Sequence, residues 1–125
     1  MKYLLDTHAL LWWLSNDTSL SDQAQVRIAS PENLIFVSAV SAWEISIKKA
    51  IGKLEAPDNL EDAIINNRFE ALPISIGDGI VAGKLPLHHK DPFDRMLIAQ
   101  AINYNLIIIT RDGQFERYGV KLLGA

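Results

Sequence analysis

The sequence lacks cysteine altogether and contains no long apolar run. Without cysteine there is neither a disulfide framework nor a thiolate metal site, and the three histidines follow no metal-binding spacing. No stretch approaches the roughly 20 consecutive apolar residues that a membrane-spanning helix needs. The N-terminus also lacks the long apolar region of a signal peptide. We therefore expect a soluble protein that has no membrane segment and acts in the cytoplasm.

Positive charge is scarce as well. The 125 residues include 12 Lys and Arg against 15 Asp and Glu, which gives a formal net charge of −3. Proteins that hold nucleic acid by overall electrostatics are usually basic, so a nucleic-acid partner would require a local basic patch or intervening cations. The hydrophobic content of 49% suffices for one core at this length. We predict a single domain spanning residues 1–125.

Apolar segments alternate with helical patterns along the whole chain. Strands are expected over residues 2–6, 34–37, 71–74, 106–109 and 120–123. Helices are expected over residues 10–14, 21–29, 38–51 or 41–51, 57–67, 77–83, 91–104 and 114–118. Strands that are apolar throughout and alternate with helices are typical of a parallel sheet covered on both faces. The predicted fold class is α/β, with a mostly parallel sheet of about four to five short strands flanked by helices.

Two acidic residues fall at predicted strand ends. Asp6 ends the first strand, and Asp112 comes shortly after the strand that ends at Ile109. Parallel sheets bind ligands beyond the carboxyl ends of their strands, which makes both residues candidates for a site. Each also has an ordinary structural explanation, because Asp often caps a helix and Thr110–Gly113 is common turn chemistry. Position alone leaves both interpretations open.

Glu44 lies on the predicted apolar face of a helix. This face consists of Val40, Glu44, Ile47 and Ile51, widened by Trp43. Burying an unpaired carboxylate is costly, so the position requires an explanation. A buried salt bridge or a helix turned toward water would be structural explanations. A role as a metal ligand would be a functional one.

Asp94 repeats this pattern in a later helix, where Leu97 and Ile98 follow it on the same face. The helix dipole favours an acid in the first turn, but it does not explain an inward-facing one. Four acids from four segments thus converge on one end of the predicted sheet, and like charges raise each other's pKa. A divalent cation would remove this conflict. Oxygen ligands suit hard cations such as Mg²⁺ and Mn²⁺.

Several motifs together resemble the PIN-domain family, and within it the VapC toxin branch. They are Leu-Leu-Asp-Thr-His at 4–8, Ser-Ala-Trp-Glu-Ile at 41–45, and His-Lys-Asp-Pro-Phe-Asp-Arg-Met-Leu-Ile-Ala-Gln-Ala at 89–101. Thr110-Arg111-Asp112 resembles the family's last acidic element, which an aromatic residue follows, here Phe115. The resemblance spans essentially the whole chain. It implies a metal-dependent endoribonuclease that cleaves RNA and is inhibited by a cognate antitoxin.

The resemblance also implies roles for individual residues. The catalytic and metal-binding acids would be Asp6, Glu44, Asp94 and Asp112. The first and third would be the primary ligands of Mg²⁺ or Mn²⁺, with Glu44 binding directly or through water. Asp112 would bind a second ion or orient a water. Thr7 and Thr110 would be hydrogen-bond partners of these acids, whereas Asp91, as the expected N-cap, would support its helix.

The chemistry of phosphodiester hydrolysis fits this set of residues. It needs a deprotonated water and compensation of charge on the phosphate, both of which bound metal supplies, from one ion or two. No nucleophilic Ser or Cys is required, so we predict direct attack by water and a 5′-phosphate product. Candidate contacts to the RNA backbone are Arg95, Lys48, Lys90 and Arg111. Each is also compatible with a solvated surface charge, and Arg95 with an ion pair to one of the acids.

Trp12 and Trp13 are adjacent in a short helix just after the first acid. Both rings cannot easily face the same interior, so at least one is expected to be exposed. Exposed aromatic residues are typical of interfaces. We therefore predict a partner interface here, for an antitoxin or for the second chain of a homodimer.

Two other classes of protein compete with this interpretation. A receiver-like phosphoacceptor would require an acceptor Asp after a middle strand and a Lys after a late one, and the sequence has neither after residues 34–37 or 106–109. A PIN-like binding module without catalysis would also have this fold, and only metal-dependent turnover separates it from an enzyme. DNA remains an alternative substrate.

Overall fold

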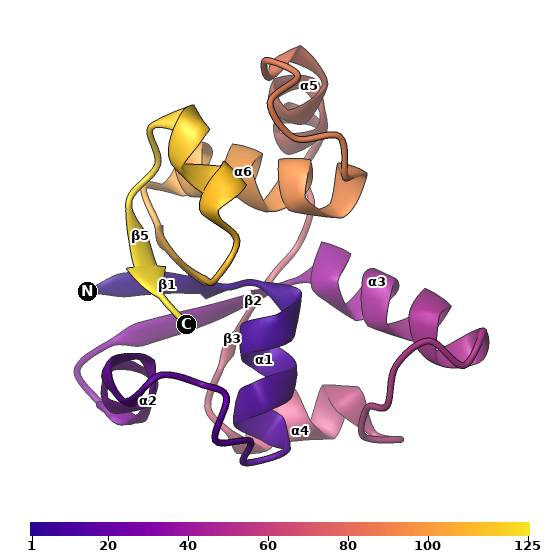
Figure 1. Cartoon of the computed structure of the whole chain (residues 1–125), viewed down its shortest axis with the longest axis vertical. Coiled ribbons are helices and arrows are strands. Elements are labelled where there is room, and N and C mark those ends of the chain that lie inside the picture. Colours follow the sequence, from indigo (N-terminus) through magenta and orange to yellow (C-terminus); the bar gives the residue numbers. More distant parts are fainter.

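The computed structural model describes all 125 residues, and at its centre lies one five-stranded sheet (Figure 1). The strands are β1 (Lys2–Leu5), β2 (Leu34–Ser38), β3 (Glu70–Leu72), β4 (Ile107–Thr110) and β5 (Leu122–Gly124). Their order in the sheet is β3-β2-β1-β4-β5, and every neighbouring pair is parallel. The predicted α/β class with a parallel sheet is therefore confirmed. The observed strands differ from the expected ones by one or two residues at their ends. The largest differences are in the two edge strands, β3 and β5.

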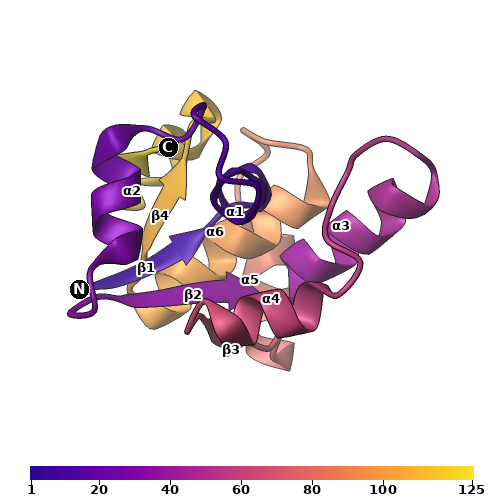
Figure 2. The ribbon, with the colours of Figure 1, turned by 90° about the horizontal axis from the view of Figure 1, so that it is seen from below.

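Helices cover both faces of the sheet. They are α1 (Thr7–Leu14), α2 (Asp22–Ala29), α3 (Ala39–Ala50), α4 (Leu60–Asn66), α5 (Ile76–Lys84), α6 (Pro92–Tyr104) and the 3-10 helix η1 (Gly113–Tyr118). Helices α1, α2 and α4 lie on one face, and α5, α6 and η1 lie on the other (Figures 1 and 2). Helix α3 continues from the end of β2 away from the sheet. None of the helices is long and apolar enough to cross a membrane.

The alternation of side chains along β1 divides the core into two clusters. Tyr3 and Leu5 pack with Leu10 of α1 on one face, and Leu4 packs with Leu97 of α6 on the other. Successive residues of a strand point to opposite faces, so an apolar strand such as β1 contributes to both layers at once. The central strand is thus buried from Tyr3 to Leu5, and its carboxyl end is held at a fixed position between the two layers.

Several helices begin at a polar cap directly after a strand or loop. The carboxylate of Asp6 accepts a 2.8 Å hydrogen bond from the Ala9 amide, so α1 starts at Thr7, three residues earlier than expected. Ser38 rather than Ser41 caps α3, which decides between the two predicted starts. Asp91 caps α6, with Pro92 in the first turn, as the sequence predicts. These caps place the start of each helix at the carboxyl edge of the sheet.

The predicted apolar face of α3 is only partly correct. Val40 and Glu44 are buried, but Trp43 and Ile51 are each 60% exposed and Ile47 is 38% exposed. The buried stripe runs instead through Val40, Ser41, Glu44 and Ile45. Because α3 extends beyond the sheet (Figure 1), no core lies beneath its second half to cover the other apolar side chains.

Candidate active site

The four predicted acids line one cavity at the carboxyl edge of the sheet. It has a volume of about 240 Å³, and no hydrophobic side chain lines it. Its lining residues are Asp6, Thr7, His8, Glu44, Lys48, Asp91, Asp94 and Asp112. Asp6 follows β1, and Asp112 comes after β4. Glu44 comes from α3, and Asp94 from the first turn of α6. The predicted convergence of four segments is therefore what the structure contains.

Asp6 serves both as a helix cap and as a wall of this cavity. It is only 7% exposed, and burial raises the pKa of its carboxyl against the opposing effect of hydrogen bonds from Thr110 and the Ala9 amide. The Thr110 hydroxyl also accepts a 3.0 Å hydrogen bond from the Asp112 amide. Thr110 therefore links the two acids that end neighbouring strands, in the position predicted for it.

Both carboxylate oxygens of Glu44 have partners. The Thr7 hydroxyl donates to Oε1 at 2.5 Å, and the Lys48 ammonium lies 2.5 Å from Oε2. The hydrogen bond to Glu44 raises the pKa of Lys48. Glu44 thus forms the buried salt bridge that was one explanation left open by the sequence, and its place in the cavity is compatible with the other, a role as metal ligand. Lys48 is engaged with this acid, and its predicted contact with the RNA backbone stays a prediction.

His89 begins the motif at 89–101, but the sequence assigned it no role of its own in the site. Its Nε2 lies 2.9 Å from a carboxylate oxygen of Asp94 and 2.9 Å from one of Asp112. One ligand atom from each of these three residues lies within 4.8 Å of the others. The ring packs edge-on against Phe115, with centroids 5.8 Å apart. The histidines follow no metal-binding spacing in sequence, because this contact is made by the fold of the loop.

The acids of the cavity are in electrostatic conflict. Burial, and then the negative charge of Asp91, raise the pKa of Asp94 to about 7, with smaller contributions from Glu44 and Asp6 and an opposing one from His89. With a pKa of about 7, the Asp94 carboxyl is only partly ionised at neutral pH, and a cation in the cavity would favour its ionised form. An all-polar cavity with carboxylate oxygens and one imidazole nitrogen is a donor set that fits a divalent cation such as Mg²⁺ or Mn²⁺.

The sequence predicted that Arg95 contacts RNA, with a solvated charge or an ion pair to an acid as alternatives. In the structure its side chain contacts backbone carbonyls instead of the acids. Its guanidinium donates to the backbone carbonyls of Ala82, Leu85, Pro86 and His89 at 2.8–3.1 Å. Four of its five N–H donors are therefore used to hold the loop between α5 and α6. The contact of Arg95 with RNA stays a prediction; in the structure Arg95 positions the loop that carries His89.

Arg111 is also used inside the protein. It donates to the carbonyls of Ser19 and Ala125, and its guanidinium lies 4.4 Å from the centroid of the Trp12 ring. These contacts attach the C-terminal residue to the loop after α1, and the assignment of Arg111 to RNA stays a prediction. Of the four predicted basic contacts, Lys90 alone is exposed without a hydrogen bond or an ion pair from its side chain.

The two adjacent tryptophans are both half-buried, contrary to the expectation that one of them is exposed. Trp13 donates a 2.9 Å hydrogen bond from Nε1 to Asn67 and packs against Phe69. Trp12 lies beneath Arg111 on the opposite flank of α1. Each ring thus finds its own neighbours within the chain. Trp43 of α3 is the exposed tryptophan instead.

Comparison with known proteins identifies the family to which this fold and site correspond. The PIN domain family model matches residues 3–121. The VapBC2 complex from Rickettsia felis, bound to a DNA fragment of its promoter, contains a chain that is 17% identical, with 98% of both chains covered and a TM-score of 0.72. FitAcB from Neisseria gonorrhoeae is 18% identical over 99% of this chain and 97% of that chain, with a TM-score of 0.70.

A toxin–antitoxin complex from Klebsiella pneumoniae is 20% identical over 98% of this chain and 96% of that chain, with a TM-score of 0.66. At these identities the likeness establishes a shared fold alone. None of the curated proteins matches the sequence.

Proposed function

The chain belongs to the PIN-domain family, and on this basis we propose that it is a metal-dependent endoribonuclease, the toxin of a VapC-type toxin–antitoxin pair. The observation that carries the proposal is the meeting of Asp6, Glu44, Asp94 and Asp112 in one polar cavity. The pKa values of Asp6 and Asp94 are raised in this cavity, and a bound cation would offset the repulsion among the four acids. Such an enzyme would act on RNA in the cytoplasm.

The residues in and beside the cavity would have different roles in hydrolysis. Asp6, Asp94 and Asp112 would hold Mg²⁺ or Mn²⁺, with Glu44 and His89 completing the set. The bound cation would lower the pKa of a water molecule and offset negative charge on the phosphate. Thr110 orients the two acids at the strand ends.

Two side chains hold Glu44 in place. The Thr7 hydroxyl and the Lys48 ammonium engage its two oxygens from opposite sides. These two contacts together fix the orientation of the Glu44 carboxylate before substrate binds. No side chain of the cavity is a nucleophilic Ser or Cys. We propose that a water molecule is the attacking group and that the product carries a 5′-phosphate.

The structural relatives support the proposed partners. The Rickettsia structure is a VapBC pair bound to a DNA fragment of its promoter, and the Klebsiella structure is a toxin–antitoxin complex. By analogy, we expect a cognate antitoxin that binds this chain and suppresses cleavage, and a homodimer of the toxin. The partner interface that we propose near Trp12 and Trp13 would use half-buried rings, and exposed Trp43 is a further residue to examine.

Cleavage of end-labelled total RNA by the purified chain tests the function. Reactions contain Mg²⁺, Mn²⁺ or EDTA, and DNA of matching sequence runs beside the RNA. A double variant, Asp6→Asn with Asp94→Asn, removes two acids from the cavity. A matched double variant, Glu32→Gln with Glu116→Gln, removes two exposed acids elsewhere.

Discrete cuts that require metal, persist in the matched variant and vanish in the cavity variant would establish the nuclease. Cutting by the cavity variant would mean contamination or a misplaced site. Absence of cutting by folded protein free of antitoxin would favour a PIN-like binding module. Preferential cutting of DNA would replace the proposed substrate.

A further inference from the structure

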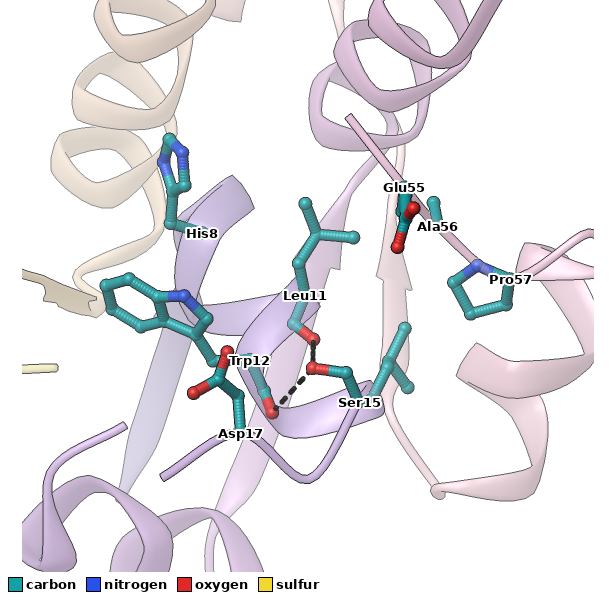
Figure 3. A pocket seen from close by; sticks show the side chains of 9 residues that line it. His8, Leu11, Trp12, Ser15, Asp17, Glu55, Ala56 and Pro57 are labelled. Carbon is teal, nitrogen blue, oxygen red and sulfur yellow. Dashed lines mark hydrogen bonds between the residues drawn. The ribbon is translucent and has the colours of Figure 1, made fainter. Parts of the chain in front are cut away.

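A second cavity adjoins the acidic pocket, with a volume of about 570 Å³ (Figure 3). We call it the Trp12 groove, and the residues important here are His8, Leu11, Trp12, Ser15, Asp17 and Glu55. Figure 3 shows His8, Trp12 and Asp17 on one side of the groove and Glu55 on the other, with Leu11 and Ser15 between them. Because His8 lines both cavities, the groove begins where the acidic pocket ends.

The Trp12 ring is held rigidly at one wall of this groove. The Arg111 guanidinium lies 4.4 Å from its centroid, and Arg111 is itself bonded to two backbone carbonyls. The His8 ring lies 6.0 Å from the Trp12 ring at an angle of 45°. A fixed aromatic ring beside a second ring is a surface on which a planar group can stack, and bases stack on aromatic side chains in single-stranded RNA complexes.

Two carboxylates face the same space. A hydrogen bond from the Ser19 amide, 2.8 Å from Asp17 Oδ1, holds the pKa of Asp17 below its ordinary value, so this group is ionised at neutral pH. Glu55 is exposed and makes neither a hydrogen bond nor an ion pair with its side chain. Negative charge at both sides repels phosphate. A planar group that presents N–H donors would be attracted instead.

A third cavity, of about 350 Å³, has one unpaired cation. Its lining includes Lys48 and Lys53, again shares His8, and also contains Glu44, which pairs with Lys48. Lys53 is exposed and forms no ion pair. Lys53 therefore gives this cavity a net positive charge that attracts phosphate. The acidic pocket is thus flanked by one surface for a base and another for a backbone phosphate, with His8 common to all three.

We propose that the Trp12 groove is a guanine-binding subsite for the nucleotide next to the scissile phosphate. The inference rests on the proposed nuclease function and adds a base preference to it. The guanine ring stacks against Trp12, and its edge donates from N1–H and N2–H to the Glu55 carboxylate. Adenine and cytosine each offer one exocyclic amine to a carboxylate, and uracil offers only N3–H, between two carbonyl oxygens that repel a carboxylate. Guanine alone presents two adjacent donors and makes the most bonds here. The neighbouring backbone phosphate lies toward Lys53.

Nucleotide binding to the metal-free protein tests the subsite without any need for activity. The indole N–H signals of the three tryptophans are followed by NMR during titration with GMP, AMP, CMP, UMP and inosine monophosphate. Trp12→Phe assigns the Trp12 signal and keeps a ring in place. GMP should shift that signal most strongly. Inosine monophosphate, which lacks the N2 amine, should bind roughly tenfold more weakly than GMP.

Glu55→Ala and Glu32→Ala form a matched pair, because both glutamates are exposed and neither is hydrogen-bonded through its side chain. Glu55→Ala should weaken GMP binding roughly tenfold, whereas Glu32→Ala should leave it unchanged. The inference would be overturned if all five nucleotides bound with equal affinity. It would also be overturned if Glu55→Ala and Glu32→Ala bound GMP equally well. If argininamide shifts the Trp12 signal and GMP does not, the groove binds a basic peptide and the proposal is wrong.

Cleavage of short oligoribonucleotides separates this inference from the function on which it rests. With Mg²⁺, the cut should fall beside guanosine, and inosine at that position should lower kcat/KM roughly tenfold. Cleavage without base preference, together with no GMP shift, would refute the subsite and leave the nuclease standing. No cleavage of any oligonucleotide would refute the nuclease, and the NMR titration would still decide whether the groove binds guanine.

Discussion

The Thr7 hydroxyl donates a 2.5 Å hydrogen bond to Oε1 of Glu44, 37 positions further along the chain. The bond joins the first turn of α1 to the buried face of α3 inside the acidic pocket. Thr7 comes directly after Asp6, which caps the same helix. One short segment therefore supplies an acid of the site and also fixes the direction of another acid from a distant helix.

Thr7→Val should weaken both metal binding and the fold. Valine has nearly the same shape but no hydroxyl, so Oε1 of buried Glu44 loses its donor. An unpaired buried acceptor costs about 1–3 kcal/mol of stability. Loss of a partner that orients a metal ligand typically lowers metal affinity about 10–100-fold. Mn²⁺ titration calorimetry and urea unfolding measure the two effects.

Thr7→Ser is the control for this change, because serine keeps the donor. It should retain metal affinity close to that of the wild type. Equal affinities for the valine and serine variants would show that the hydroxyl does not position Glu44.

The metal-free protein should lose stability through Asp94 as the pH rises from about 4 to about 7. Burial and the charge of Asp91 raise the pKa of Asp94 from 3.8 to about 7. Between these values the folded protein keeps a proton on Asp94 that the unfolded chain releases, so the free energy of unfolding falls as the pH rises. Asp94→Asn removes this group and should stabilise the metal-free protein at about pH 8 by more than about 1 kcal/mol.

Urea unfolding of both proteins in EDTA, at several pH values, measures the difference. Glu32→Gln provides a charge-matched control that should follow the wild type, since Glu32 is exposed outside the pocket. Parallel profiles for wild type and Asp94→Asn would contradict the assigned titration.

Mg²⁺ should stabilise the wild-type protein against heat. A ligand that binds only the folded state contributes about 2.7 kcal/mol at a free concentration of 100 times its Kd. The carboxylates of Asp6 and Asp94 gain the cation that relieves their repulsion, so the Tm should rise and EDTA should reverse it. In the Asp6→Asn, Asp94→Asn double variant the rise should disappear. NaCl at equal ionic strength controls for screening, and an equal rise with NaCl would refute a specific site.

The location of the acidic site could be predicted from the sequence because it depends on chain order. Asp6 and Asp112 come after apolar strands, and parallel strands end at the same edge of a sheet. Glu44 and Asp94 were recognisable because an acid on an apolar helix face needs a reason to be there. Helical periodicity and the cap at Asp91 gave the positions of the helices that carry them.

The remainder of the site depends on contacts that leave no local signal. Arg95 and Arg111 donate to backbone carbonyls, and any residue supplies a carbonyl, so no sequence pattern marks such a partner. His89 reaches the acids through the path of a loop. The exposure of Trp43 follows from the extension of α3 past the sheet, which periodicity within one helix cannot show.

Arg95→Lys should lower kcat more than it changes KM. One ammonium cannot replace a guanidinium that donates to four carbonyls, so the loop before α6 should loosen, at a cost of about 2 kcal/mol of stability. His89 lies in that loop and would lose its fixed position beside Asp94. Steady-state cleavage kinetics and thermal unfolding measure both effects.

Lys90→Ala is the matched control for a basic residue near the same loop. Lys90 is exposed and unpaired, so its removal should leave stability unchanged while raising KM and lowering the salt dependence of binding. If Arg95→Lys shows this second pattern instead, Arg95 contacts RNA after all.

Asp78 of α5 should behave in the opposite way to Asp94. Burial raises its pKa, but hydrogen bonds from Asn103, Ser75 and Gln100 outweigh that effect and hold the pKa below 3.8. A depressed pKa gives stability that is complete above the unfolded value and is lost as the pH falls through the folded one. Asp78 therefore stabilises the protein at neutral pH and ceases to do so in acid.

Asp78→Asn should cost about 3 kcal/mol at pH 7, because the new amide group meets the amide donors of Gln100 and Asn103. Since Asp78 holds α5 against α6 outside the acidic pocket, kcat/KM measured well below the Tm should fall less than twofold. Urea unfolding at pH 7 and pH 3 should show a difference between variant and wild type that shrinks in acid. A difference that grows in acid would mean that the carboxylate is not held ionised by these donors.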